Sequence, residues 1–264
     1  ERFAREHGAV KLTGPMGFCD FDKQGLLIEG FEELGSMVTL YNHPYYAGHI
    51  ERLGYDKDVD MIEHQMRPGD QVPEQLERLS ALVLKRFNLK FVPLKKTKDV
   101  LKYAKGIFTV LNEAYVNLHG VTLIPERQME YLTKQYFSFI NPDYIKLVTN
   151  DKDELVAFGI AMPSLSKALQ KSNGRLFPFG FISVLKAIRK NDTLELYFVG
   201  VKPELQDKGV NAVLMAEMAK SAIRNGIKIA ESSVMLETNT KIQAFWKHWD
   251  NRLHKRRRFY IKDL

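Results

Sequence analysis

A strand followed by a helix is predicted between Thr193 and Gly226. Residues 193–201 are rich in β-branched and aromatic side chains, which is typical of a buried strand. Apolar residues then recur at helical spacing, and Gly226 is suited to cap the C-terminus of that helix. They are Val210, Val213, Leu214, Met218 and Ile223. The turn at residues 206–211 therefore leads into the N-terminus of a helix.

This turn has the features of an anion-binding site. The first backbone amides of a helix lack intrahelical partners, and the helix dipole adds partial positive charge there. Gly209 allows the backbone to approach a ligand closely, and Lys208 adds a full positive charge. The pattern predicts that the turn holds a pyrophosphate.

The segment Val201-x-Pro203-x-x-Gln206-x-x-Gly209-x-Asn211 resembles the acyl-CoA-binding signature of the GNAT N-acyltransferase superfamily, which is Gln/Arg-x-x-Gly-x-Gly/Ala after a strand. Asn211 departs from the signature, and its side chain either crowds the phosphates or adds a hydrogen bond. A glycine at a strand–helix junction can also be no more than a tight turn. The resemblance implies that the pyrophosphate of acyl-CoA is held by Gln206, Asp207, Lys208, Gly209, Val210, Asn211 and Ala212.

The order of the predicted elements from residue 89 to 264 is β-α-α-β-β-β-α-β-α-β. Beyond the strand and helix described above, strands are predicted at 89–94, 144–149, 155–162, 228–236 and 253–261, and helices near Asp99, after Pro125 and at 239–249. This is the element order of a GNAT domain. The resemblance therefore implies an α/β protein with a mixed sheet, in the acyl-CoA N-acyltransferase (GNAT) fold.

The first seventy residues resemble part of a second such unit. Gly8 and Gly226 both close helices before strands, and Asn42 and Asn239 both open helices. We therefore predict a partial GNAT-like unit at 1–70, a helical connection at 71–88 and a complete GNAT domain at 89–264. Tandem units of this kind occur in a group of bacterial proteins and in the Fem-type aminoacyltransferases. The alternative is that any strand–helix–strand segment shares this pattern.

Glu195 is the candidate general base for acyl transfer. An amine must lose a proton before it attacks a thioester. Glu195 lies eleven residues before Gln206, the offset that the base glutamate occupies in the histone-modifying branch of the superfamily. Burial on a mostly apolar strand should raise the pKa of this carboxyl. The alternative is that Glu195 is a half-exposed glutamate paired with a lysine. Glu231 and Glu237 are the substitute candidates for the general base.

Main-chain groups of the same strand are expected to hold the thioester and the pantetheine arm. The resemblance places this role on Val199, Gly200 and Val201, where the strand splays from its neighbour, and Gly200 would favour a bulge there. Asn239 matches the family asparagine that faces the pantetheine, although it can also be a plain N-cap.

The general acid is missing from its expected place. Where the family often has a tyrosine, this chain has Trp246, which cannot give up a proton near neutral pH. Either the thiolate leaves unaided, Tyr197 or Tyr260 substitutes, or the chain is not an enzyme.

The composition is that of an ordinary soluble globular protein, with 45% hydrophobic and 27% charged residues in 264. No apolar run approaches the ~20 residues of a membrane span, and the opening Glu1-Arg2-Phe3 suggests a fragment or a processed chain. Cys19 is the only cysteine, which fits a reducing cytoplasm. No Cys/His cluster has metal-ligand spacing, so we predict no metal site.

The net charge of +7 allows a nucleic-acid partner, an anionic ligand such as coenzyme A, or nothing beyond solubility. Because most basic residues are widely spread, we favour a solvated surface and expect no stable nucleic-acid partner. The run at residues 255–258 can bind phosphates, but a solvated edge strand guarded by charge is the favoured interpretation.

Residues 164–190 form an insertion between two core strands, with apolar residues interleaved with lysines and arginines. An amphipathic helix packed on its own domain is the commoner case. A lid over the acceptor and an interfacial helix on an anionic membrane are the alternatives.

The sequence thus predicts an N-acyltransferase that moves an acyl group, expected to be acetyl, from acetyl-CoA or another acyl-CoA to a primary amine by direct attack in a ternary complex. The acceptor is expected to be a small molecule or a peptide. A Fem-like transferase that uses aminoacyl-tRNA and a GNAT-shaped binding protein without catalysis are the alternatives. The oligomeric state is not predicted.

Overall fold

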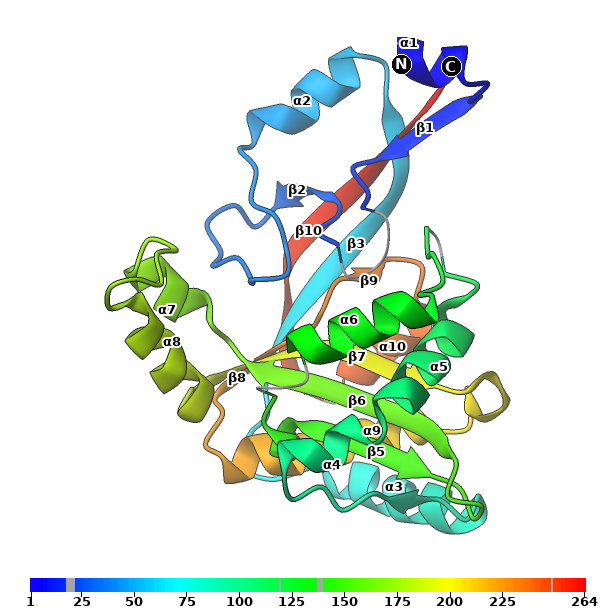
Figure 1. Cartoon of the computed structure of the whole chain (residues 1–264), viewed down its shortest axis with the longest axis vertical. Coiled ribbons are helices and arrows are strands. Elements are labelled where there is room, and N and C mark those ends of the chain that lie inside the picture. Colours follow the sequence, from blue (N-terminus) through cyan, green and yellow to red (C-terminus); the bar gives the residue numbers. More distant parts are fainter. Residues whose placement is uncertain (18–21, 119, 137–139, 248) are drawn as a thin grey trace.

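The computed structural model describes residues 1–17, 22–118, 120–136, 140–247 and 249–264. Within these residues ten strands form one mixed sheet. The strands are β1 (Lys11–Gly14), β2 (Leu26–Glu29), β3 (Asp56–Arg67), β4 (Lys90–Phe91), β5 (Ile145–Thr149), β6 (Leu155–Pro163), β7 (Thr193–Val201), β8 (Ile229–Glu231), β9 (Met235–Leu236) and β10 (Asp250–Asp263). Their order is β1-β10-β3-β8-β7-β6-β5-β4, with β2 paired to β10 and β9 to β3 (Figure 1). The mixed α/β architecture is the one that the sequence predicts.

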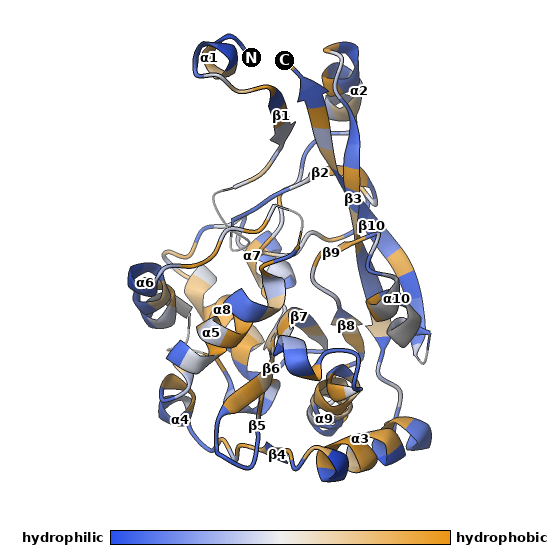
Figure 2. Cartoon of the chain, turned by 90° about the vertical axis from the view of Figure 1, so that its right-hand side faces the viewer, coloured by the Kyte–Doolittle hydropathy of each residue, from blue (hydrophilic) through white to orange (hydrophobic). Residues whose placement is uncertain are grey.

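The helices cover both faces of the central strands. They are α1 (Arg2–Glu6), α2 (Tyr45–Arg52), α3 (Glu74–Arg86), α4 (Thr97–Leu101), α5 (Ala104–Tyr115), α6 (Glu126–Tyr136), α7 (Ser166–Lys171), α8 (Gly180–Arg189), α9 (Val210–Arg224) and α10 (Thr240–Trp246), with short 3₁₀ turns η1 (Pro142–Tyr144) and η2 (Pro203–Leu205). Figure 2 shows α5 and α9 on opposite sides of β6. Every residue of β5 and β6 is buried, as expected for strands covered on both faces.

Alternate residues of β6 feed two separate hydrophobic clusters. Phe158 and Ile160 pack with Ile107 and Phe108 of α5. Ala157 packs on the other face with the start of α9, in a cluster that also holds Val83 of α3. The period of two along the strand therefore joins α3, α5 and α9 to one sheet.

The N-terminal seventy residues and the C-terminal region share this sheet. β3 lies between β8 and β10 and pairs antiparallel with β10 from Asp56–Ile261 to Arg67–Asp250. Figure 1 shows the two strands running together from the centre of the molecule to the end where both termini lie. The boundary at residue 70 stays a prediction about repeat units, since the two segments build one sheet.

The prediction of a solvated edge strand at the C-terminus is wrong. β10 has β3 on one side and β1 and β2 on the other. Lys255 and Arg257 are each 1% exposed, and both contact Glu63. Arg258, on the opposite face, pairs with Asp60. These cations neutralise buried carboxylates of β3 and do not guard an edge.

Two further features concern single segments. The strand predicted at 228–236 is broken into β8 and β9, which both pair with β3. Cys19 lies outside the described residues. None of the helices in the described part of the chain is both long and apolar enough to cross a membrane.

Candidate active site

Glu195 lies in the middle of the sheet, where β7 and β8 begin to separate. The parallel pairing of these strands covers only three residues of each, and it ends at the pair Glu195–Glu231. The Glu195 side chain is 3% exposed. The half-exposed, lysine-paired alternative therefore does not describe this residue.

Three hydroxyl groups donate to the Glu195 carboxylate. The hydroxyls of Ser164 and Ser166 lie 2.6 Å and 3.3 Å from Oε1, and the Tyr197 hydroxyl lies 2.9 Å from Oε2. Ser164 and Ser166 stand at the start of the insertion, next to the end of β6. The antiparallel register of β6 and β7, which pairs Pro163 with Leu194, brings them to the carboxylate.

Burial raises the pKa of the Glu195 carboxyl above its ordinary value of 4.5. The Ser164 and Tyr197 hydrogen bonds oppose this, the nearby Glu231 adds to it, and the Ser166 bond again lowers the pKa. The result is a buried carboxyl that binds its proton more tightly than a solvated one, as the sequence predicts. Such a group is a functional-site candidate.

Beyond Glu195, the β8 side of β7 has no strand partner in the described part of the chain. The Val199 carbonyl accepts a hydrogen bond from the Tyr115 hydroxyl at 3.2 Å, and the Val201 carbonyl accepts one from the Gln206 side chain at 3.0 Å. In a strand, the amide of a residue points to the same edge as its carbonyl. The Val199 amide therefore points to the open edge, where a ligand can reach it.

The bulge expected at Gly200 lies elsewhere. The register between β6 and β7 shifts where Ile160 pairs with Phe198 and Ala161 pairs with Leu196, so Tyr197 is the extra residue. Gly200 has a different role, because a side chain there would collide with the Phe158 ring. The bulge directs the Tyr197 hydroxyl to Glu195.

The turn before α9 offers unpaired backbone donors. In the described residues, the amides of Lys208, Gly209, Val210 and Asn211 donate to no backbone carbonyl, whereas Ala212 donates to the Gly209 carbonyl at 3.0 Å. The side chains of Asp207 and Asn211 are exposed, and Val210 and Ala212 are buried in the first turn of the helix.

Positive charge gathers beside this turn. Lys208 Nζ and Arg86 Cζ lie 5.5 Å and 5.4 Å from the centre of the Phe87 ring. Arg86 ends α3, which packs on α9. Amides and cations at one helix N-terminus fit an anion such as a pyrophosphate.

Gly209 is required by packing as well as by backbone conformation. Its φ of +82° is a left-handed value. A Cβ at this position would lie 3.1 Å from Val83 Cγ2 on α3. The absence of a side chain at Gly209 therefore makes room for α3. On this side of the turn, α3 makes the close contact that the sequence predicted for a ligand.

Of the other candidate site residues, some lie close to Glu195 and others lie far from it. Asn239 caps α10, where its Oδ1 accepts from the Ile242 amide at 3.3 Å. Glu231 lies opposite Glu195, whereas Glu237 pairs with Lys57. Tyr260 bonds to Glu51. Of the two tyrosines proposed as substitutes for the general acid, Tyr260 therefore lies outside the candidate site and Tyr197 lies within it.

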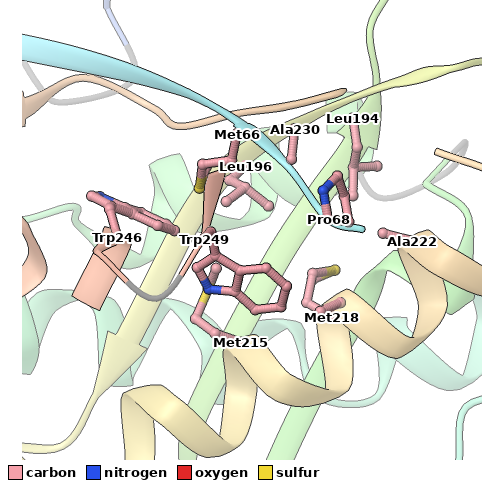
Figure 3. Close-up of a pocket in the computed structure, with 11 residues that line it drawn as sticks. Met66, Pro68, Leu194, Leu196, Met215, Met218, Ala222, Ala230, Trp246 and Trp249 are labelled. Carbon is pink, nitrogen blue, oxygen red and sulfur yellow. The ribbon is translucent and has the colours of Figure 1, made fainter. Parts of the chain in front are cut away.

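An apolar pocket lies between the separating strands and α9 (Figure 3). Leu194 and Leu196 of β7 face Met215 and Met218 of α9 across it, and Trp249 closes one side. Trp246, in the place expected for a general acid, lines the same pocket. The volume of this pocket is about 30 Å³, which gives room for about one water molecule.

Sequence reasoning missed Ser164, Ser166 and Arg86. A signal for the serines existed, because they follow a strand predicted to be next to the Glu195 strand. Arg86 gave no signal, since its place beside Lys208 depends on how α3 packs.

Residues 108–249 match the model of the Acetyltransferase (GNAT) family. This match covers more than half of the chain and includes Glu195 and the turn before α9. The chain belongs to the GNAT family. Similarity to bacterial GNAT proteins was also the prediction from the sequence.

Two curated proteins are similar to this GNAT chain over its whole length. Protein YghO of Escherichia coli (strain K12) is 27% identical over 272 residues, which cover 68% of that protein. The bacterial ceramide synthase of Caulobacter vibrioides is 25% identical over 274 residues, which cover 70% of that protein.

Solved GNAT structures share the fold. A GCN5-related N-acetyltransferase from Sphaerobacter thermophilus matches 99% of this chain and 64% of its own, with a TM-score of 0.58 and 11% identity. A tandem GNAT protein from the clavulanic acid biosynthesis pathway matches 99% of this chain and 66% of its own, with a TM-score of 0.51 and 12% identity. The chain thus spans slightly less than two thirds of these proteins.

Proposed function

We propose that this chain transfers an acyl group from acyl-CoA to a primary amine, with Glu195 as the general base. The observation that carries the proposal is the buried Glu195 carboxyl, whose raised pKa suits it to take a proton from an amine. It lies where β7 and β8 separate, between the open edge of β7 and the turn before α9.

Acyl-CoA supplies an acyl group activated as a thioester. The unpaired amides at residues 208–211, with Lys208 and Arg86 beside them, would hold its pyrophosphate. The Val199 amide would donate to the pantetheine arm or to the thioester oxygen as that oxygen gains charge. Acetyl is the acyl group that the sequence predicts, and the donor panel below tests it.

Tyr197 connects Glu195 to the more open part of the site. Its side chain is half-buried, and its hydroxyl donates to the carboxylate. The amine passes one proton through Tyr197 to Glu195, its nitrogen bonds to the thioester carbon, and the carbon–sulfur bond breaks. The sulfur then takes a proton from Tyr197, which regains one from Glu195. A second proton leaves the nitrogen as the amide forms and is released to solvent.

The acceptor would enter through an open cleft between the loop at residues 31–41 and α7. This cleft is lined by Phe31, Glu32, Glu33, Leu34, Gly35, Tyr41, Lys167 and Gln170. Lys167 follows Ser166, which contacts Glu195. The exposed Glu32 carboxylate would attract a protonated amine.

A long-chain amine is a second candidate acceptor. The relative named as a bacterial ceramide synthase is 25% identical over the whole of this chain, and a ceramide is a long-chain amino alcohol acylated on nitrogen. The apolar side chains of Phe31, Leu34 and Tyr41 in the cleft favour such an acceptor over a fully polar one.

The test is turnover of a panel of acyl-CoA donors with polar and long-chain primary amines, measured as free thiol and as the mass of the acylated amine. We expect equal amounts of thiol and amide, and coenzyme A binding in the micromolar range by calorimetry. Absence of coenzyme A binding would overturn the proposal. Binding without turnover would favour a GNAT-shaped binding protein, and thermal stabilisation by aminoacyl-tRNA but not by coenzyme A would favour a Fem-like transferase. Fractionation of the source cells would test the predicted cytoplasmic location.

A further inference from the structure

The insertion between β6 and β7 exposes an unusual amount of apolar surface. It folds into the helices α7 and α8 with a connecting turn, and Figure 1 shows this hairpin projecting from the side of the sheet. Phe177 and Phe179 in the turn are 79% and 73% exposed. The exposed apolar residues, called here the hairpin surface, are Leu176, Phe177, Phe179, Phe181, Ile182 and Leu185.

Helix α8 turns its apolar arc outward. None of its ten residues is buried, although most of them are apolar. At 100° per residue, Phe181, Ile182 and Leu185 share one arc of the helix, and all three are exposed. The other side of the helix, with Val184 and Ala187, is only half-buried against the protein. The predicted common case, in which the helix packs its apolar face on its own domain, therefore describes only one side of α8.

The charge of the insertion is entirely positive. Residues 164–191 contain no aspartate or glutamate and six cations, namely Lys167, Lys171, Arg175, Lys186, Arg189 and Lys190. The chain has 39 basic and 32 acidic residues, so the remaining residues hold 33 basic against 32 acidic ones, a net charge of +1. By sequence, the insertion thus contributes six of the seven net positive charges of the protein, of which Lys167 is paired with Asp192 just beyond it.

We propose that the hairpin surface docks on an anionic lipid bilayer. The phenylalanine rings would enter the interface between headgroups and acyl chains, and the surrounding lysines and arginines would contact lipid phosphates. A second copy of the chain is a poorer occupant, because it would bring two surfaces of the same strong charge together. The charge around the surface complements an anionic membrane.

Docking here would place the candidate active site at the membrane. The hairpin begins at Ser164 and Ser166, which hold Glu195, and α7 supplies Lys167 and Gln170 to the acceptor cleft. An amine that resides in the bilayer could then reach the cleft without leaving the lipid surface. The docking itself does not depend on the acyl-transfer chemistry and is tested without acyl-CoA.

The experiment is co-sedimentation of the purified chain with vesicles of phosphatidylcholine alone or mixed in equal parts with phosphatidylglycerol. We expect at least tenfold tighter binding to the anionic vesicles, weakened by added salt. The double variants Phe177→Ser/Phe179→Ser and Lys171→Glu/Arg175→Glu should each weaken this binding at least tenfold. Matched controls elsewhere, Phe3→Ser/Val10→Ser and Lys85→Glu/Lys152→Glu, change side chains that are also exposed and should bind as the wild type does.

Three outcomes would overturn the proposal. The first is equal binding to neutral and anionic vesicles, or no binding to either. The second is retention of full binding in both hairpin variants. The third is a lipid-free, concentration-dependent rise in mass that Phe177→Ser/Phe179→Ser abolishes, since the surface would then join copies of the chain.

Discussion

The Ser164 hydroxyl donates a 2.6 Å hydrogen bond to Oε1 of Glu195, thirty-one residues along the chain. It joins the first residue of the cationic insertion to the buried carboxyl between β7 and β8. Because both groups are buried, the bond is shielded from water. It is also the strongest of the contacts that hold the pKa of Glu195 down against burial.

Removing this bond should shift the pH dependence of catalysis. In Ser164→Ala the Glu195 carboxylate loses a donor, so the pKa of Glu195 should rise further. The acid limb of kcat/KM should move to higher pH, with the wild-type rate approached again in alkaline solution. The pH–rate profile measures this shift. Ser172→Ala is the control, because its hydroxyl donates only to backbone carbonyls of α7; an unmoved limb in Ser164→Ala would separate Glu195 from the base role.

Charge reversal at Lys208 should weaken coenzyme A binding. Lys208 is exposed beside the turn before α9. An exposed charge contact contributes about 1 kcal/mol, and a charge reversal removes this attraction and adds a repulsion of similar size, so we expect Lys208→Glu to weaken binding by about tenfold or more. Calorimetry compares it with Lys11→Glu, which reverses an exposed lysine on β1, at the other edge of the sheet. Equal dissociation constants for the two variants would place the pyrophosphate elsewhere.

Alanine at Gly209 should destabilise the fold for two separable reasons. The left-handed φ costs about 1–2 kcal/mol for a residue with a Cβ, and the new Cβ would press on Val83. Gly226→Ala meets the same backbone strain in open space, with a φ of +73° and no neighbour within 4 Å. Urea unfolding should therefore show a larger loss of unfolding free energy for Gly209→Ala than for Gly226→Ala. In the double variant Gly209→Ala/Val83→Ala, only the part of the loss that comes from the Val83 contact can be relieved, and the φ penalty should remain. Equal losses in the two glycine variants would show that α3 does not press on the turn.

Glu63 should contribute strongly to the stability of the sheet that the N-terminal and C-terminal segments share. It is 2% exposed and pairs with both Lys255 and Arg257, each of which is also buried. Glu63→Gln leaves two buried cations without this counter-charge and should cost roughly 3–5 kcal/mol of unfolding free energy. Glu29→Gln breaks an exposed pair with Arg256 on the same strand and should cost less than about 1 kcal/mol. Similar losses for both variants in urea unfolding would contradict the buried pairing of β3 with β10.

Local patterns predicted the part of the site that is local in sequence. The strand at residues 193–201, the turn at 206–211 and the helix after it follow from apolar spacing and a glycine, and the structure has them at β7 and α9. The raised pKa of Glu195 also follows from local sequence, because an apolar strand implies burial. The alternation of side-chain direction along β10 was also predictable. In the structure Lys255 and Arg257 both pair with Glu63, whereas Arg256 and Arg258 both reach Asp60.

Long-range pairing was not predictable from these patterns. The Arg257–Glu63 contact spans 194 residues, and nothing in either segment shows that β3 lies between β8 and β10. A run of four cations is therefore indistinguishable in sequence from a solvated strand. The Tyr197 bulge depends in the same way on register with β6, and the role of Gly209 depends on the packing of α3.

The most direct test of the account is the activity of Glu195→Gln, compared with Glu6→Gln as a remote, exposed control. The folded protein keeps a proton on Glu195 at pH values where the unfolded chain has lost it. Ionisation of this buried group should therefore lower the unfolding free energy of the wild type as pH rises above 4.5, and Glu195→Gln should lack this fall. The account predicts that Glu195→Gln binds coenzyme A as the wild type does, while kcat/KM for acyl transfer falls roughly 100- to 10,000-fold and loses its acid limb. A Glu195→Gln enzyme with full kcat/KM and an unchanged pH profile would contradict it.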